Sequence, residues 1–175
     1  MMQRVAVIAT AVLLFLIEPN FAFLSPLQFD TTLYYFVPRF LLVYLIFLAT
    51  YHSKKRAMYI GLFFGILYDI FYVDIIGLYA FLYPAIIFLA SVVMGYIRPN
   101  MVVTSTVALV LITILESVLY GFYSFIGLTA MTWQPFIQER LLPTIAMNFL
   151  FIILVAIIFV NLINAKLLRD EMNTV

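Results

Sequence analysis

One stretch decides the fold class: MVVTSTVALVLITILESVLYGFYSFI, residues 101–126. Its only charged residue is Glu116, and about 20 mostly apolar residues in a helix are enough to cross a bilayer. The whole chain has the same character, because 67% of its 175 residues are hydrophobic and 10% are charged, against roughly a quarter charged in a soluble domain. This composition excludes a water-soluble enzyme, a nucleic-acid-binding protein and a disordered regulator. We therefore predict an all-α integral membrane protein with a single domain, residues 1–175.

Six apolar stretches of this kind follow one another along the chain. They cover residues 5–24, 37–51, 57–72, 75–96, 101–126 and 136–164. Six spans of about 20 residues occupy most of the sequence, so the loops are short and leave no room for a soluble domain. The first stretch resembles a secretory signal peptide. Since no small-residue cleavage site follows it and five more spans do, we predict an uncleaved first helix.

The basic residues indicate the orientation of these six spans, because Lys and Arg are retained in cytoplasmic loops. An even number of spans places both termini on one side of the membrane. That side carries seven of the nine basic residues, namely Arg4, Lys54, Lys55, Arg56, Arg98, Lys166 and Arg169. We therefore predict cytoplasmic termini in a bacterial cell membrane. The cluster Lys54, Lys55 and Arg56 is interpreted as a topology determinant, with contact to anionic lipid or to a cytoplasmic filament as the alternative.

Five charged residues fall in the outer halves of the predicted spans. Each outward-going helix carries one carboxylate, and these are Glu18, Asp69 and Glu116; two inward-going helices begin near Arg39 and Arg140. An ionisable group at the centre of a bilayer costs roughly 2.5–3.5 kcal/mol, so such groups are candidates for a role. Helices joined by one loop usually lie side by side. The expected ion pairs are therefore Glu18 with Arg39 and Glu116 with Arg140.

Polar residues at helical spacing surround the second of these pairs. On the fifth span one face carries Thr106, Thr113, Glu116, Tyr120 and Tyr123, and on the sixth span Arg140, Thr144 and Asn148 recur at intervals of four. Two polar stripes joined by one short loop should face each other, away from lipid. Two interpretations stay open. The polar set is either a network that locks one helix arrangement, or the lining of a substrate cavity or partner-binding groove on the outer side.

The third span carries small residues at every fourth position. Ala57, Gly61 and Gly65 form this ridge, and Asp69 is next in the series. Small residues at this spacing let two helix backbones approach closely. We expect the ridge to pack within the chain, with a homodimer seam as the alternative, and we expect Asp69 to be buried at the end of the contact.

The sequence lacks the residues that most catalytic or metal sites need. It has no cysteine, and its one histidine, His52, lies beside the basic loop. A zinc site needs several nitrogen or sulfur ligands, and a Ser–His pair needs a histidine within the membrane. Asp69 and Asp74 lie at one helix end, which favours a helix cap and a loop over a protease dyad. We predict no enzymatic activity, no cofactor, no metal and no nucleic-acid partner.

Several segments resemble the rod shape-determining MreD family. The central one is RAMYIGLFFGILYD, residues 56–69, followed by Gly77-Leu-Tyr. Others are Pro38-Arg39-Phe40, Leu115-Glu116 and Arg140-Leu-Leu-Pro143-Thr, in matching order over nearly the whole chain. By this resemblance, the intramembrane polar positions of the family fall on Glu18, Arg39, Asp69, Glu116 and Arg140.

The resemblance implies a non-enzymatic scaffold of the bacterial cell-wall elongation complex that helps to set rod cell shape. Its implied partner is an MreC-like single-span protein. Through that protein it is connected to MreB filaments, a RodA-type polymerase and a class B penicillin-binding protein, with membrane lipid around it. MreD proteins are similar in fold to the substrate-binding subunits of energy-coupling-factor transporters. A solute-binding subunit of a vitamin-type transporter is therefore the alternative function, although no energy-coupling motif is visible.

Overall fold

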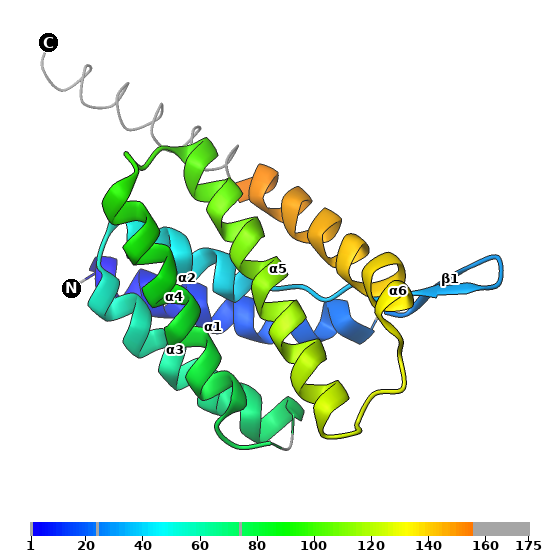
Figure 1. Cartoon of the computed structure of the whole chain (residues 1–175). Coiled ribbons are helices and arrows are strands. Elements are labelled where there is room, and N and C mark those ends of the chain that lie inside the picture. Colours follow the sequence, from blue (N-terminus) through cyan, green and yellow to red (C-terminus); the bar gives the residue numbers. More distant parts are fainter. Residues whose placement is uncertain (1, 24, 74, 156–175) are drawn as a thin grey trace, which may run out of the picture.

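The computed structural model describes residues 2–23, 25–73 and 75–155, and these residues are mostly helical (Figure 1). The long helices are α1 (Met2–Phe23), α2 (Phe40–Tyr51), α3 (Lys54–Tyr68), α4 (Leu78–Tyr96) and α5 (Met101–Phe125). A π-helical turn, η1 (Asp69–Val73), extends α3. The last described helix begins as α6 (Trp133–Pro135), passes through a second π-helical segment, η2 (Phe136–Leu141), and continues to Val155. The prediction of a helical membrane protein is confirmed at this level.

Four of these helices are long and apolar enough to cross a membrane: Lys54–Val73, Leu78–Tyr96, Met101–Phe125 and Trp133–Val155. Two shorter apolar helices, Val7–Phe21 and Phe40–Tyr51, accompany them. The count of six spans stays a prediction. The predicted sixth span extends to residue 164, and its end, like Lys166 and Arg169, lies outside the described residues.

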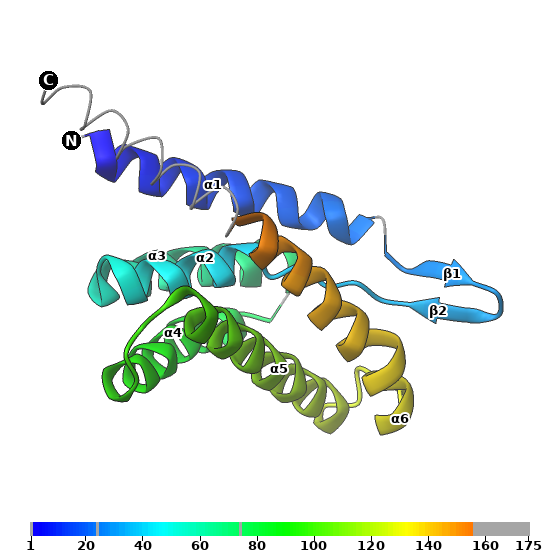
Figure 2. The ribbon, with the colours of Figure 1, turned by 90° about the horizontal axis from the view of Figure 1, so that it is seen from above.

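A small β-hairpin precedes α2 and was not predicted from the sequence. Strands β1 (Leu27–Phe29) and β2 (Thr32–Tyr34) are antiparallel, with Leu27 opposite Tyr34. Asp30 takes a positive φ of 56° in the turn, a conformation that Asp adopts more readily than most residues. The hairpin projects from the helices (Figures 1 and 2).

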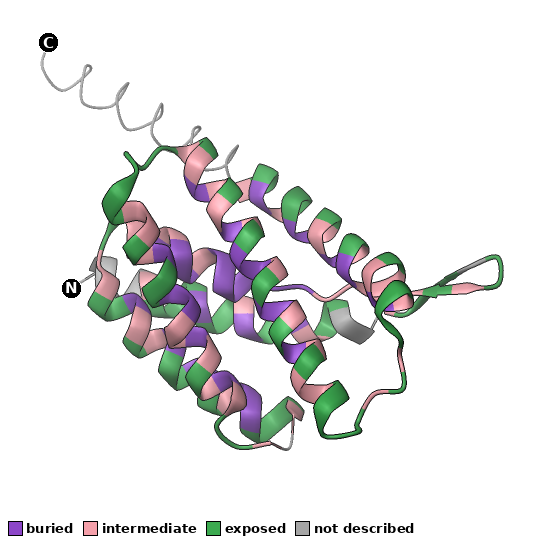
Figure 3. Ribbon diagram, viewed as in Figure 1, coloured by how far each residue is buried: buried purple, intermediate pink, exposed green. Residues whose placement is uncertain are grey.

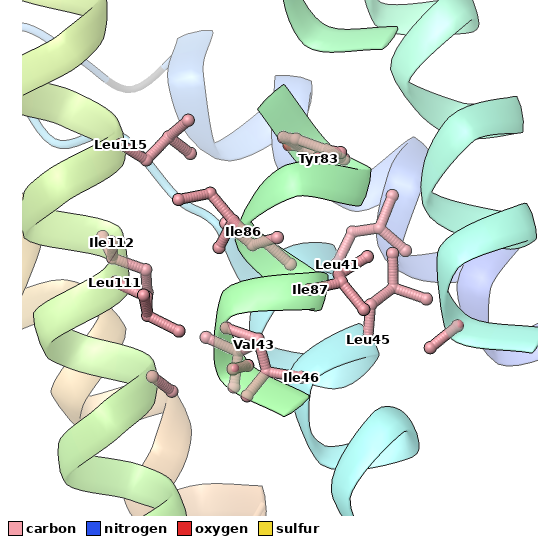
Figure 4. Close-up of a cluster of buried hydrophobic side chains, with 14 of the residues drawn as sticks. Leu41, Val43, Leu45, Ile46, Tyr83, Ile86, Ile87, Leu111, Ile112 and Leu115 are labelled. Atoms are coloured by element: carbon pink, nitrogen blue, oxygen red, sulfur yellow. The ribbon is translucent and has the colours of Figure 1, made fainter. Parts of the chain in front are cut away.

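The short helix α2 is the centre of the bundle. Its 12 residues span about 18 Å at 1.5 Å per residue, and most of them are buried (Figure 3). Leu41, Val43, Leu45 and Ile46 of α2 pack beside Ile86 and Ile87 of α4 and near Leu111, Ile112 and Leu115 of α5 (Figure 4). A helix that is apolar all round is expected in such a core position.

Helices α3 and α4 approach each other through the small-residue ridge. Ala57 is fully buried. A Cβ atom at Gly61 would lie 2.5 Å from Ile87 Cδ1, and one at Gly65 would lie 2.5 Å from the Tyr79 carbonyl oxygen. Both glycines therefore face α4 of the same chain. In a homodimer seam at these positions, a second copy would have to take the place that α4 occupies.

The loops gather at two ends of the bundle (Figure 1). One, which we call the N-terminal end, holds the start of α1 and the loops at residues 52–53 and 97–100. The other, which we call the distal end, holds the hairpin and the loops at residues 75–77 and 126–132. Lys54, Lys55 and Arg56 form the first turn of α3 at the N-terminal end.

Candidate functional site

An extended segment, residues 35–39, enters the bundle at the distal end and is held by side chains of the last helix. The Val37 N–H donates to Thr144 Oγ1 at 3.1 Å, and the Arg39 N–H donates to Asn148 Oδ1 at 2.8 Å. In return, Asn148 Nδ2 donates to the Val37 carbonyl oxygen at 3.0 Å. Thr144 and Asn148 are fully buried. Because unpaired backbone groups are costly away from water, these two side chains fasten an irregular segment to the last helix.

Two further side chains complete this fastening. Glu18 Oε1 of α1 accepts from the Leu41 N–H at 2.6 Å, which satisfies a donor in the first turn of α2. Ser25 Oγ accepts from the Phe36 N–H at 2.8 Å. Elements from both halves of the sequence therefore meet at the start of α2.

Glu116 lies at the centre of the charged site and contacts two arginines. Arg39 Nη2 lies 2.6 Å from Glu116 Oε1, and Arg140 Nη2 lies 3.3 Å from Glu116 Oε2. The Glu116 and Arg39 side chains are 0% and 4% exposed, whereas that of Arg140 is 33% exposed. Arg39 also donates to the Tyr79 hydroxyl at 2.9 Å, and its guanidinium lies 5.2 Å from the centre of the Tyr79 ring. The charges thus connect α4, α5, the last helix and the start of α2.

These contacts correct two sequence-based expectations. Arg39 pairs with Glu116 and not with Glu18, and among the described residues Glu18 forms no ion pair. Thr144 and Asn148 form their described hydrogen bonds with the extended segment and with their own helix, not with polar side chains of α5. The physical reason is the same in both cases, because the unpaired backbone groups at the start of α2 take up these side chains. The Glu116–Arg140 pair forms, as expected for two helices joined by one loop.

Asp69 is fully buried and caps the start of α4. Its carboxylate accepts from the backbone N–H groups of Gly77, Tyr79 and Ala80 at 2.9, 2.7 and 3.0 Å. A positive φ of 104° at Gly77 suits glycine at this turn. A carboxylate at a helix N-terminus is stabilised by the free N–H groups there. Asp74, the other acid considered for a dyad, lies outside the described residues.

The basic cluster contacts its own surroundings at the N-terminal end. Lys54 Nζ lies 4.1 Å from the centre of the Phe88 ring, and Arg56 Nη1 lies 2.9 Å from His52 Nε2. Lys55 lines one end of an apolar groove of about 720 Å³ between α3 and α4. The basic cluster therefore lies next to this groove.

Comparison with known proteins places the chain in a family. The family model described as rod shape-determining protein MreD matches residues 2–166. The chain belongs to the MreD family. The rod shape-determining protein MreD of Bacillus subtilis (strain 168) is 32% identical over 174 residues, covering 97% of this chain and 100% of that relative. No solved structure matches the chain significantly. Membership of the MreD family assigns the chain a role in rod shape determination at the membrane.

Sequence reasoning missed one contributor to this MreD-family site. The sequence places Tyr79 near the expected membrane interface, where tyrosines are common. In the structure Tyr79 is 5% exposed and binds Arg39. The sequence feature that could have identified Tyr79 is its position two residues after Gly77. This position becomes informative only once Asp69 is known to cap α4. In the part of the chain that the structure describes, no three His, Asp or Glu side chains lie together in a metal-binding arrangement.

Proposed function

We propose that this MreD-family chain is a non-enzymatic scaffold of the cell-wall elongation complex, which binds an MreC-like single-span protein. The family match over residues 2–166 supports the shape-determining role. The engagement of two buried carboxylates, Glu116 and Asp69, supports the scaffold role and is the observation that carries it. Glu116 is occupied by two arginines, and Asp69 by three backbone N–H groups. These groups hold helices in place and are not free for proton transfer.

The proposed docking surface for the partner helix is the apolar groove between α3 and α4. Its walls include Tyr59, Leu62, Phe81 and Phe88, and Phe81 is 71% exposed. Helices associate in a bilayer through close packing, since lipid supplies no hydrophobic drive. The groove has a volume of about 720 Å³. Being concave, it offers one apolar helix more packing contact than a convex face does. We therefore assign the groove to the single span of the MreC-like protein.

A photo-crosslinking side chain at position 81 is expected to capture a co-expressed MreC-like protein, because Phe81 lines the groove and is exposed. The matched control is position 110 on α5, since Val110 is 52% exposed and lies outside the groove. The measurement is the crosslinked band in membranes, next to co-purification of the unmodified pair through a tagged MreC-like protein.

The two measurements separate the partner from the groove. Co-purification with crosslinking at position 110 alone would keep the partner and reject the groove. If the pair does not co-purify and rod-shaped cells keep their shape after deletion of the gene, the scaffold function itself is rejected.

The proposed orientation places the N-terminal end of the bundle in the cytoplasm, with MreB filaments on that side. The RodA-type polymerase and the class B penicillin-binding protein act on the opposite side and are reached through the MreC-like protein. Two groups of basic residues at the N-terminal end support this orientation, because basic residues are retained in cytoplasmic loops. They are Lys54, Lys55 and Arg56 at the start of α3 and Arg98 in the loop between α4 and α5.

Because the chain contains no cysteine, single-cysteine variants can report this orientation. Thr31→Cys in the hairpin turn is expected to react with a membrane-impermeant maleimide in intact cells. His52→Cys in the α2–α3 loop is expected to react only after the membrane is permeabilised. The reverse pattern of labelling would show that the chain has the opposite orientation.

A second candidate function, solute binding in a vitamin-type transporter, is favoured by one cavity at the distal end. It measures about 270 Å³ and is lined by Tyr35, Tyr120, Tyr123, Thr129 and Arg140, among others. A purified chain that retains a vitamin in a stoichiometric amount would place this function ahead of the scaffold.

A further inference from the structure

We propose that a second distal cavity binds the primary ammonium group of an aminophospholipid headgroup, with Glu18 as its hydrogen-bond acceptor. The cavity measures about 370 Å³ and lies where α1, α3 and the extended segment meet. Its walls include Glu18, Ser25, Arg39, Tyr68 and Tyr72. This inference rests on the geometry of the cavity and is independent of the partner protein proposed above.

The cavity wall contains two buried polar atoms that the described part of the chain leaves without a hydrogen bond. One is Glu18 Oε2, whereas Oε1 of the same carboxylate is bonded to the Leu41 N–H. The other is the Tyr68 hydroxyl. Glu18 is 2% exposed. A buried carboxylate oxygen accepts hydrogen bonds and is costly without one, so the missing group is a donor.

The charges at the distal end indicate that this donor is a cation. The buried carboxylates there are Glu18, Asp69 and Glu116, and the arginines at this end are Arg39 and Arg140. Both arginines are bound to Glu116, and Asp69 is satisfied by backbone N–H groups. The distal end therefore holds three buried carboxylates but only two guanidinium groups among the described residues. Glu18 is the carboxylate left over, and a buried carboxyl group is ionised only beside a partner of opposite sign, which an ammonium group would supply.

The aromatic walls suit an ammonium group in particular. Tyr68 and Tyr72 line the cavity, and Phe15 packs against both rings at centroid distances of 5.1 and 5.6 Å. Aromatic faces attract cations within about 6 Å, and a primary ammonium carries three hydrogen-bond donors. This combination of carboxylate and aromatic rings is complementary to a small alkylammonium group.

The position of the cavity indicates that a lipid supplies this group. Tyr72 is 47% exposed. The cavity is lined by Glu18 and Pro19 near the end of α1, and the hairpin projects from that end of the bundle (Figure 2). Tyr and Trp side chains mark the level of the lipid headgroups in membrane proteins. A headgroup amine is therefore present at this depth in either orientation of the chain. A free amine in solution is the other possible source of an ammonium group.

Native mass spectrometry of the full chain in detergent tests the proposal with lipids of identical acyl chains. Phosphatidylethanolamine is expected to be retained about tenfold better than phosphatidylglycerol, which has no amine, because burial strengthens the ion pair. It is also expected to be retained better than phosphatidylcholine, whose trimethylammonium has no N–H for Glu18 Oε2. Equal retention of the three lipids would overturn the site, and equal binding of free ethanolamine would overturn the lipid source.

Three variants connect the retention to the cavity. Glu18→Gln keeps an acceptor for the Leu41 N–H but places an amide where Oε2 stands, and is expected to lose about tenfold in phosphatidylethanolamine retention. Tyr68→Phe removes a hydroxyl without a described protein partner, so the fold is expected to persist while retention falls. Asp30→Asn removes a charge from the exposed hairpin turn and is the control. Unchanged retention in both cavity variants would overturn the proposal. If Glu18→Gln folds poorly, unchanged retention in Tyr68→Phe alone would overturn it.

Discussion

Replacing Glu116 with glutamine is expected to destabilise the protein by about 3–5 kcal/mol, the usual loss when one partner of a buried ion pair is removed. The carboxylate is fully buried and serves two arginines, of which Arg39 has a side chain that is only 4% exposed. Glutamine keeps the shape but not the charge, so Arg39 retains a buried positive charge without a counter-ion. The measurement is the midpoint of thermal unfolding of the purified chain in detergent.

The matched control is Glu139→Gln, the same chemical change in the segment that carries Arg140. Glu139 is half-buried, and among the described residues its side chain forms no ion pair. Its unfolding midpoint is expected to stay near that of the wild type. The double variant Glu116→Gln/Arg39→Gln is expected to be more stable than the sum of the two single losses predicts, since residues in contact are not additive. Additive losses, or a wild-type midpoint for Glu116→Gln, would contradict the pair.

The helices themselves were predictable because their signal is local. The predicted span 101–126 corresponds to Met101–Phe125, and the predicted span 75–96 to Leu78–Tyr96. The start of α3 differs because polar chemistry extends this helix beyond its apolar run. Helix α3 begins at Lys54 and not at residue 57, because Ser53 Oγ accepts from the Arg56 N–H at 3.4 Å and caps a charged first turn.

The partners of the buried charges were predictable only across a single loop. Glu116 and Arg140 belong to neighbouring helices, and neighbours in sequence usually pack together. Arg39 and Glu116 are 77 positions apart, and no spacing rule connects them. The roles of Thr144 and Asn148 were hidden for another reason. They depend on which backbone groups the extended segment leaves unpaired, and that becomes known only once the start of α2 is placed.

The spacing of the glycines predicted where α3 makes a close helix contact. It did not predict how well each glycine position would tolerate a larger side chain. A methyl group at Gly65 would lie 2.5 Å from the Tyr79 carbonyl oxygen, 2.8 Å from the Tyr79 carbonyl carbon and 2.9 Å from Ala80 Cα. All three atoms belong to the backbone of α4. That backbone is held in turn by Asp69 and, through the Tyr79 side chain, by Arg39. Relief of the clash therefore requires α3 and α4 to separate.

Gly65→Ala is accordingly expected to destabilise the chain by about 3 kcal/mol, at the upper end of the range for overpacked cores. Gly61→Ala is expected to cost less, because the one close contact of its new methyl group is the flexible end of Ile87 at 2.5 Å, and the next atoms lie at 3.7 and 3.8 Å. Gly121→Ala on α5 meets nothing within 4 Å, and it should gain about 0.5–1 kcal/mol from helix propensity. Thermal unfolding midpoints should therefore rank Gly121→Ala, wild type, Gly61→Ala and Gly65→Ala from highest to lowest. If Gly65→Ala and Gly121→Ala behave alike, then α3 and α4 are not in backbone contact, and the cap that Asp69 provides for α4 has to be placed differently.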